Sequence, residues 1–231
     1  MRAGQEAPHV HDEGRRVATF VVATVVCRIQ HHPARAHLLP PLKAALFGLP
    51  VEVIEDNGDR VNPWRAYRAC LEPPAPKRAT HVLVIQDDTQ PCIGFPQALT
   101  EALAGAQDNP VALFVSRQAL RTAPRFQRAL QRGEPWCEWD IREGWVNVVA
   151  LAWPVQVIPE FLAWCDSRGY HKGFWRADDA IVGEFMRTTG RRVLATVPCL
   201  VEHPDVEPSV AQPRRVSHKG TRRLAIAFRD A

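Results

Sequence analysis

Two adjacent carboxylates, Asp87 and Asp88, follow directly after the apolar residues 81–85. If those residues form a strand, both carboxylates stand at its carboxyl end, where ligands of open α/β sheets gather. Two carboxylates so close together repel each other unless a cation or a hydrogen-bond donor compensates them. A Mg²⁺ or Mn²⁺ ion that also binds substrate phosphates would do so. The structural alternative is that one aspartate only caps the turn that follows.

A second acidic pair, Asp178 and Asp179, opens an amphipathic segment that ends at Gly190. Carboxylates are favoured at a helix start by capping and by the helix dipole, so one interpretation is purely structural. The functional interpretation is that one carboxylate takes a proton from an attacking hydroxyl group. Such a base suits displacement at a sugar carbon whose leaving group is a metal-bound diphosphate.

His203 follows the last apolar segment of the chain, residues 193–201. A neutral imidazole at a strand end can ligate a metal ion, whereas a lone histidine is more often a surface or satisfied residue. We expect Asp88, Asp179 and His203 to converge on one rim of the sheet, around a single cation and diphosphate.

Alternating apolar and amphipathic segments must position these side chains. Strands are expected at residues 17–26, 51–54, 81–85, 111–115, 145–153 and 193–201. Helices are expected at residues 37–46, 64–71, 95–104, 159–168 and 178–189. Residues 118–143 have weak periodicity and are expected to be irregular with a helix inside. The alternation predicts an α/β fold with a Rossmann-like, mostly parallel sheet and helices on both faces.

The composition is that of a folded protein. Of the 231 residues, 46% are hydrophobic and 23% charged, enough for a sizeable core, which excludes wholesale disorder. The six cysteines form no C-x-x-C pair, so neither a zinc knuckle nor a short disulfide scaffold is expected. The polar start has no signal-peptide pattern, and no apolar run is long enough to span a bilayer. We therefore expect a cytoplasmic protein with no membrane partner.

Gln86-Asp87-Asp88 after an apolar strand resembles the Asp-x-Asp signature of nucleotide-sugar glycosyltransferases with the GT-A fold. By this resemblance Asp88 makes the metal contact with Asp87 beside it, and Gln86 stands where the family has its first acidic residue. Residues 197–203 look like the Pro-Ser-Leu-Val-x-His segment that closes many such domains. The resemblance makes His203 a further metal ligand and implies Mn²⁺ or Mg²⁺ as the cofactor.

Residues 177–190 are similar to the Glu-Asp-plus-helix element of inverting members of that family. The match implies that Asp179 is the catalytic base and that Asp178 positions the acceptor. Residues 21–28 and 31–35 resemble the first strand and loop that receive the nucleotide, and the exit of the second strand adds a contact to the base or ribose. The donor-binding residues expected on this basis are Thr24, Arg28, Arg35, Asp56 and Asp87, and a basic lid over the donor would add Lys219 and Arg222.

The basic residues 214–223 admit three interpretations. They could fold as a lid over the donor diphosphate, with Lys219 and Arg222 offsetting its charge. They could contact a polyanion such as a DNA backbone, or form a solvated terminus. The domain organisation that we expect is a disordered tail at residues 1–15, a GT-A-like catalytic domain at residues 16–210 and this basic segment at residues 211–231.

Three tryptophans, Trp136, Trp139 and Trp145, lie close together in the sequence. Aromatic faces stack on sugars and on bases, so these side chains could build an acceptor platform. Tryptophans are also often core residues, and the sequence leaves both roles open.

The resemblance covers about residues 17–229 and implies a glycosyltransferase, hexosyl or pentosyl, that moves a sugar from a nucleotide-diphosphate donor to a hydroxyl acceptor. It also implies inversion at the anomeric carbon and a metal cofactor. Small cytoplasmic members include phage-encoded enzymes that glycosylate hydroxymethylated pyrimidines in DNA, so modified DNA is a candidate acceptor, in keeping with the net charge of +4.

Two other function classes remain open, and the sequence makes no prediction of the oligomeric state. A nucleotidyltransferase has a similar sheet and acidic metal site but releases pyrophosphate rather than a nucleoside diphosphate. A non-enzymatic nucleic-acid-binding module would explain the basic segment but not the acidic pairs at a strand end and a helix start.

Overall fold

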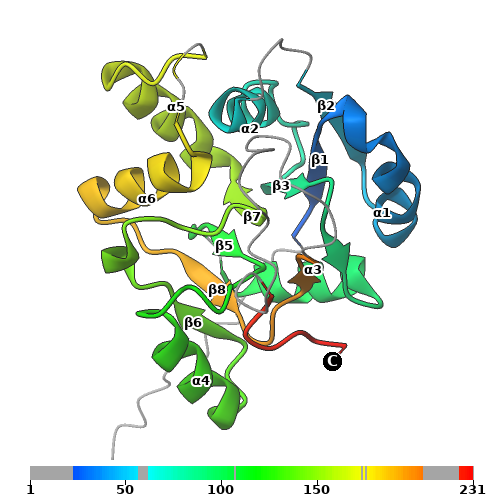
Figure 1. Ribbon diagram of the computed structural model, residues 1–231, viewed down its shortest axis with the longest axis vertical. Helices are drawn as coiled ribbons and strands as arrows, with labels where there is room; N and C mark the ends of the chain where they lie inside the picture. The colour runs from blue at the N-terminus through cyan, green and yellow to red at the C-terminus, as the bar shows by residue number, and fades with distance from the viewer. Residues whose placement is uncertain are drawn as a thin grey trace, which may run out of the picture.

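Figure 1 shows the computed structural model, which describes residues 23–56, 62–106, 108–172, 174, 176–204 and 224–230. The tail expected at residues 1–15 lies outside the described residues. So does most of the basic segment, including Lys219 and Arg222. The roles suggested for those parts of the chain stay predictions.

The described residues build a central sheet of seven strands in the order β2-β1-β3-β7-β5-β8-β6. The strands are β1 (Val25–His31), β2 (Val51–Glu55), β3 (His81–Gln86), β5 (Val111–Ala112), β6 (Trp136–Glu138), β7 (Ala150–Pro154) and β8 (Leu194–Thr196). β1 is parallel to β2 and β3, and β5 is parallel to β8, whereas β7 and β6 are antiparallel to their neighbours. Five of these seven strands therefore point the same way, which confirms the predicted α/β fold with a mostly parallel sheet.

A two-stranded sheet pairs β4 (Gln90–Pro91) with β9 (Val201–Glu202). The α-helices are α1 (Leu39–Ala45), α2 (Pro63–Leu71), α3 (Phe95–Ala104), α4 (Ala123–Arg132), α5 (Ile158–Ser167) and α6 (Asp178–Thr189). Three short 3₁₀ turns are η1 (Pro33–Leu38), η2 (Ile141–Glu143) and η3 (Val155–Val157). Helices α2, α5 and α6 lie together on one side of the sheet, and α1 and α3 lie on the other (Figure 1). None of the described helices has the length and apolar character that a bilayer crossing requires.

The first strand differs most from its predicted position. Residues 17–22 lie outside the described residues, and β1 begins at Val25 and continues to His31. The apolar run in the sequence ends before Arg28, yet Arg28 and His31 are both buried in the strand. The shift is about five residues. The strand therefore ends at His31 rather than at residue 26, and the loop that follows it begins at His32.

Other boundaries differ for local reasons. The strand expected at residues 193–201 is two strands, β8 and β9, because Pro198 has no N–H to donate to a ladder. β7 starts at Ala150 rather than at residue 145. The helix expected at residues 37–46 is η1 followed by α1, whose first turn holds Pro40. The bounds predicted for α3 and α6 are confirmed, since a glycine closes each helix.

An aromatic cluster beneath the sheet holds α6 in place. Trp153 of β7 stacks on Phe161 of α5 with ring centroids 4.6 Å apart, and Phe161 meets Phe185 of α6 at 5.0 Å. Trp64 of α2 packs edge-on against Phe161 at 5.9 Å. All four side chains are fully buried. Aromatic contacts of this kind fix the position of α6 relative to the strands, and with it the acidic pair at its start.

Arg28 does not reach a ligand site, contrary to the sequence prediction that it binds the donor. Its fully buried guanidinium donates from Nε to Glu52 Oε2 at 2.7 Å. The two terminal nitrogens donate to the carbonyl oxygens of Cys70, Pro73 and Pro74 at 2.9 to 3.1 Å. The shifted strand explains the difference, because it puts Arg28 in the middle of β1 rather than in the loop beyond it. Arg28 ties β1 to β2 and to the end of α2.

We expect Arg28→Ala to lower the free energy of unfolding by about 3 kcal/mol or more, because it strands buried carbonyl groups and one carboxylate. Urea denaturation measures this loss. The matched control is Arg192→Ala, which removes an exposed arginine paired with Glu138 and should cost less than about 1 kcal/mol. Equal losses in the two variants would contradict a structural role for Arg28.

Candidate active site

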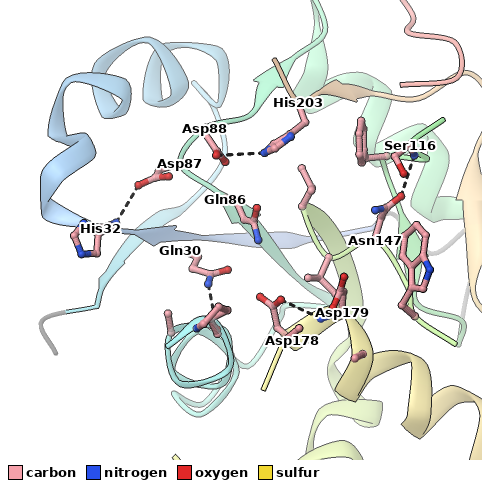
Figure 2. Close-up of a pocket in the computed structure, with 18 of the residues that line it drawn as sticks. Gln30, His32, Gln86, Asp87, Asp88, Ser116, Asn147, Asp178, Asp179 and His203 are labelled. Atoms are coloured by element: carbon pink, nitrogen blue, oxygen red, sulfur yellow. Dashed lines mark hydrogen bonds and ion pairs between the residues drawn. The ribbon is translucent and has the colours of Figure 1, made fainter. Parts of the chain in front are cut away.

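The described residues enclose a cavity of about 650 Å³ at the carboxyl ends of β1 and β3. Its walls come from those strand ends, the start of α6, the residues 144–149 and His203 (Figure 2). Cavities of this size suit a small-molecule ligand. Asp88, Asp179 and His203, which are far apart in the sequence, all line it. The expected convergence of the three sites on one rim is therefore confirmed.

Asp87 is held by the protein itself. Its Oδ2 lies 2.9 Å from Nδ1 of His31 and accepts from the backbone N–H of His32 at 3.0 Å. Its Oδ1 accepts from Arg35 at 3.1 Å. Both oxygens are thus engaged, and the residue is only 4% exposed. Asp87 fixes the loop after β1 against the end of β3, and its predicted contact with the donor would be indirect.

Asp88 has one engaged oxygen and one unengaged oxygen. Its Oδ2 accepts from Arg35 at 2.5 Å and lies 3.2 Å from Nε2 of His203, whereas its Oδ1 is buried with no hydrogen-bond partner among the described residues. Burial would raise the pKa of Asp88, but the hydrogen bond and charge of His203, with those of Arg35, outweigh it and lower the pKa to about 2. Asp88 is therefore ionised at any physiological pH.

Asp178 has the opposite environment. It is 6% exposed, and its Oδ1 accepts from the N–H of Asp179 at 3.0 Å in the first turn of α6. Its Oδ2 is buried and forms no hydrogen bond of normal geometry in the described part of the chain. Burial, and then the charge of Asp179, raise the pKa of Asp178 to about 7, although the nearby amide of Gln30 slightly favours the charged form. Asp178 can therefore gain or lose a proton near neutral pH.

Trp145 alone of the three tryptophans lines the cavity. Trp139 is buried and donates from Nε1 to the carbonyl of Trp145 at 2.9 Å, while the Trp136 ring packs on Gly105 outside the cavity. A Cβ atom on Gly183 of α6 would lie 2.5 Å from the Cα of Trp145. The missing side chain of Gly183 thus lets α6 approach the Trp145 backbone closely, next to the acidic pair. Trp136 and Trp139 have the structural role that the sequence left open.

The expected donor-binding residues separate into two groups. Arg35 and Asp56 line the cavity as Asp87 does. Thr24 does not: its N–H donates to Thr80 Oγ1 at 3.0 Å before β1 begins. Seven residues of a strand span about 23 Å, so the shifted position of β1 moves Thr24 to the wrong end of the sheet for a ligand contact.

Several residues of the cavity wall were not predicted. Gln30 and Gln86 are register partners at the ends of β1 and β3, and both face the cavity. Asn147 lines the opposite wall, where its Oδ1 accepts from the N–H of Ser116 at 2.9 Å. The sequence could have identified the two glutamines, because each is a polar residue near the end of a largely apolar strand. No pattern in the sequence marks Asn147, which lies in what was expected to be a strand.

The donor set can be tested against a divalent metal ion. No group of three or more His, Cys, Asp or Glu side chains is arranged to hold a metal within the described ranges. Asp88 and His203 nevertheless offer a buried, ionised oxygen with no partner and an adjacent imidazole. Oxygen and imidazole ligands suit Mn²⁺, and Mg²⁺ and Mn²⁺ accept substrate phosphates as co-ligands. The residues fit a divalent ion as a two-residue site that a bound phosphate group completes.

No protein-family model matches the chain, and no curated protein matches it. Among solved structures, a mutant of Drosophila β-1,4-galactosyltransferase 7 in complex with manganese, UDP-Gal and xylobiose is similar at a TM-score of 0.45 and 12% identity, over 86% of this chain and 82% of that one. The catalytic domain of the same enzyme with xylobiose is similar at a TM-score of 0.47 and 11% identity, over 79% and 71%.

We expect Asp178→Asn to stabilise the protein in a pH-dependent way. The pKa of Asp178 is higher in the folded chain than in the unfolded one, so its contribution to stability is fully present below about pH 4 and is lost as the pH rises through 7. Asparagine stays neutral and keeps an oxygen for the Asp179 N–H. The variant should match the wild type near pH 4 and exceed its free energy of unfolding above pH 7, by on the order of 4 kcal/mol.

Urea denaturation at a series of pH values measures this difference. The control is Asp179→Asn, which changes the neighbouring, less buried carboxylate and should give a smaller pH-dependent gain. A gain for Asp178→Asn that is independent of pH, or a loss above pH 7, would refute the raised pKa.

Proposed function

We propose that the chain is a glycosyltransferase that moves a sugar from a nucleotide-diphosphate donor to a hydroxyl acceptor. The observation that carries the proposal is one cavity with two acidic sites of opposite character, Asp88 with a lowered pKa and Asp178 with a raised one. Sugar transfer needs a site that manages the charge of a departing diphosphate and a separate group that accepts a proton. Paired carboxylates whose environments push their pKa values apart meet both needs.

On the donor side, Arg35 and Asp88 present opposite charges to the cavity. A guanidinium matches phosphate oxygens with two parallel hydrogen bonds. Asp88 and His203 are the residues that would hold a Mn²⁺ or Mg²⁺ ion. Such an ion, when bound, stabilises negative charge on a leaving diphosphate. Asp56, at the other end of this wall, is proposed to lie near the nucleoside.

On the acceptor side, we assign the proton acceptor to Asp178. Its raised pKa lies near the operating pH, where a general base is most effective, and its unengaged Oδ2 faces the cavity region beside Gln30. The family resemblance gives the same role to Asp179, with Asp178 as the positioning residue. The two assignments are competing predictions, and matched variants separate them.

Trp145 lies next to this acidic pair and is the proposed stacking surface for the acceptor. Because the proposed base and the proposed diphosphate site come from different walls of the cavity, a hydroxyl activated at Asp178 would approach the sugar from the side away from the leaving group. Direct displacement from that side inverts the anomeric carbon. Inversion is thus the stereochemistry that the arrangement favours.

The test is product analysis with a panel of nucleotide sugars, in the presence and absence of Mn²⁺. We expect one donor to release a nucleoside diphosphate, and we expect Asp178→Asn to lower kcat/KM by about 10²–10⁴-fold with little change in donor binding. In wild type, kcat/KM should rise with pH to a plateau above about 7, because the base must be ionised.

Asp179→Asn is the matched control, and it should retain most of the turnover. The reverse pattern, with Asp179→Asn inactive and Asp178→Asn active, would move the base to Asp179. Release of pyrophosphate would instead identify a nucleotidyltransferase. No turnover and no binding with any donor would refute the proposed function.

A hydroxymethylated pyrimidine in DNA remains a proposed acceptor, and a cytoplasmic location goes with it. If DNA is bound through at least two phosphate contacts, its affinity should fall about tenfold or more between 50 and 200 mM salt, since bound counterions are released. Fluorescence anisotropy with a hydroxymethylated duplex measures this slope. Salt-independent binding, or none, would exclude the DNA acceptor and favour a carbohydrate, with sugar transfer itself unaffected.

A further inference from the structure

Arg35 already offsets one of the two negative charges of the acidic pair that a metal ion is expected to compensate. One terminal nitrogen of Arg35 donates to Oδ1 of Asp87 at 3.1 Å and to Oδ2 of Asp88 at 2.5 Å. The side chain is 11% exposed and lines the cavity. A cation bound by the free Oδ1 of Asp88 would therefore lie a few ångströms from a guanidinium. Like charges at that separation in a partly buried site repel strongly.

We propose that Arg35 is an internal counter-ion of Asp88 that holds cation affinity low until a diphosphate arrives and draws the guanidinium onto its own oxygens. The exchange with a diphosphate rests on the proposed function, whereas the competition between Arg35 and the cation does not. Arg35 keeps its bond to Asp87 as an anchor while it gives up Asp88. The freed carboxylate and His203 then face the cation together with the phosphates.

Three features support the exchange. Arg35 sits on η1, directly after β1, at a position where the backbone leaves helical geometry with φ −112° and ψ 23°. The side chain is thereby directed back towards the strand ends rather than along the helix axis. Asp87, unlike Asp88, has its other oxygen fixed by His31 and His32, so the anchor end of the bridge is rigid. The partners of Asp88 in the described part of the chain are two side chains, Arg35 and His203, and both line the cavity.

The neutral Gln86 makes the competition by Arg35 effective. It occupies the strand-end position before Asp87, where an acidic residue would add a second negative charge facing the cation. On this wall, among the residues that the structure describes, Asp88 is the carboxylate with an unengaged oxygen. A nearby guanidinium therefore removes most of the attraction for a metal ion. Cation binding and diphosphate binding are then coupled, and each strengthens the other to the same extent.

The experiment compares wild type with Arg35→Gln in two binding measurements that use no turnover. Mn²⁺ alone is titrated and the unbound ion is measured by electron paramagnetic resonance. Radiolabelled UDP, as the diphosphate probe, is measured by equilibrium dialysis without metal. We expect Arg35→Gln to bind Mn²⁺ at least about tenfold more tightly and metal-free UDP at least about tenfold more weakly. Changes of opposite sign separate the counter-ion role from loss of structure, which would weaken both.

Three further variants complete the design. Arg142→Gln removes the same charge from an exposed arginine that is paired with the buried Asp140 outside the cavity, and it should leave both affinities unchanged. Arg35→Lys keeps the charge with a smaller set of donors, and both of its affinities should lie between those of wild type and Arg35→Gln. Adding Asp88→Asn to Arg35→Gln should abolish the gain in Mn²⁺ affinity.

The Mn²⁺ measurement decides the proposal. Mn²⁺ affinity in Arg35→Gln that equals or falls below the wild-type value, in a protein that unfolds cooperatively at a similar temperature, would overturn the counter-ion role. If that variant is unfolded, Arg35→Met, which removes the same charge and keeps most of the side-chain length, is titrated in its place and judged by the same criterion. A gain of Mn²⁺ affinity in Arg35→Gln, together with a wild-type chain that transfers no sugar from any donor, would refute the proposed function and leave the role of Arg35 intact.

Discussion

The site depends on a difference in charge compensation between the carboxylates that meet at one edge of the sheet. Asp88 is paired with Arg35 and His203, whereas Asp178 is buried beside another carboxylate, Asp179. Charges interact several-fold more strongly in a partly dry cavity than in water, so small differences in partners become large differences in pKa. Two aspartates in a single cavity thus have different protonation states near neutral pH. The fold creates this difference by placing cationic side chains on only one of the two acidic walls.

The difference in pKa between Asp88 and Asp178 lasts only if both side chains are held in place, because a carboxylate that moves into water regains its ordinary pKa. Asp178 is kept out of water by the position of α6, which the stacked rings of Trp153, Phe161 and Phe185 hold against the sheet. On its other side, Gly183 lets α6 approach the backbone of Trp145, and the N–H of residue 146 donates to the carbonyl of Asp179 at 3.1 Å. Burying a carboxylic acid in this way lowers the free energy of unfolding at neutral pH. A site that needs a base with a pKa near 7 keeps the buried acid in spite of this loss.

Much of this arrangement was predictable from sequence, and the errors have a common origin. The bounds of α6 and the polar exit of β3 follow from local patterns, so the convergence of Asp88, Asp179 and His203 could be predicted. The roles of Thr24 and Arg28 could not, because β1 lies about five residues further along than its apolar run indicates. A strand can bury an arginine only when distant carbonyl groups accept its protons, and those partners come from residues 70–74. Periodicity carries no information about such partners.

The same limit applies to the two members of each acidic pair. Adjacent aspartates are equivalent in sequence, but they leave the backbone in different directions and meet different partners. Asp87 is fixed by backbone and histidine donors, whereas Asp88 keeps an oxygen for a ligand. With Gln86 neutral and Arg35 bridging the pair, the two carboxylates retain one excess negative charge instead of the larger charge of an acidic triplet. An approaching diphosphate therefore meets less repulsion at this wall than an acidic triplet would exert. The charge balance of the empty wall, rather than the number of its carboxylates, determines which ligand can enter first.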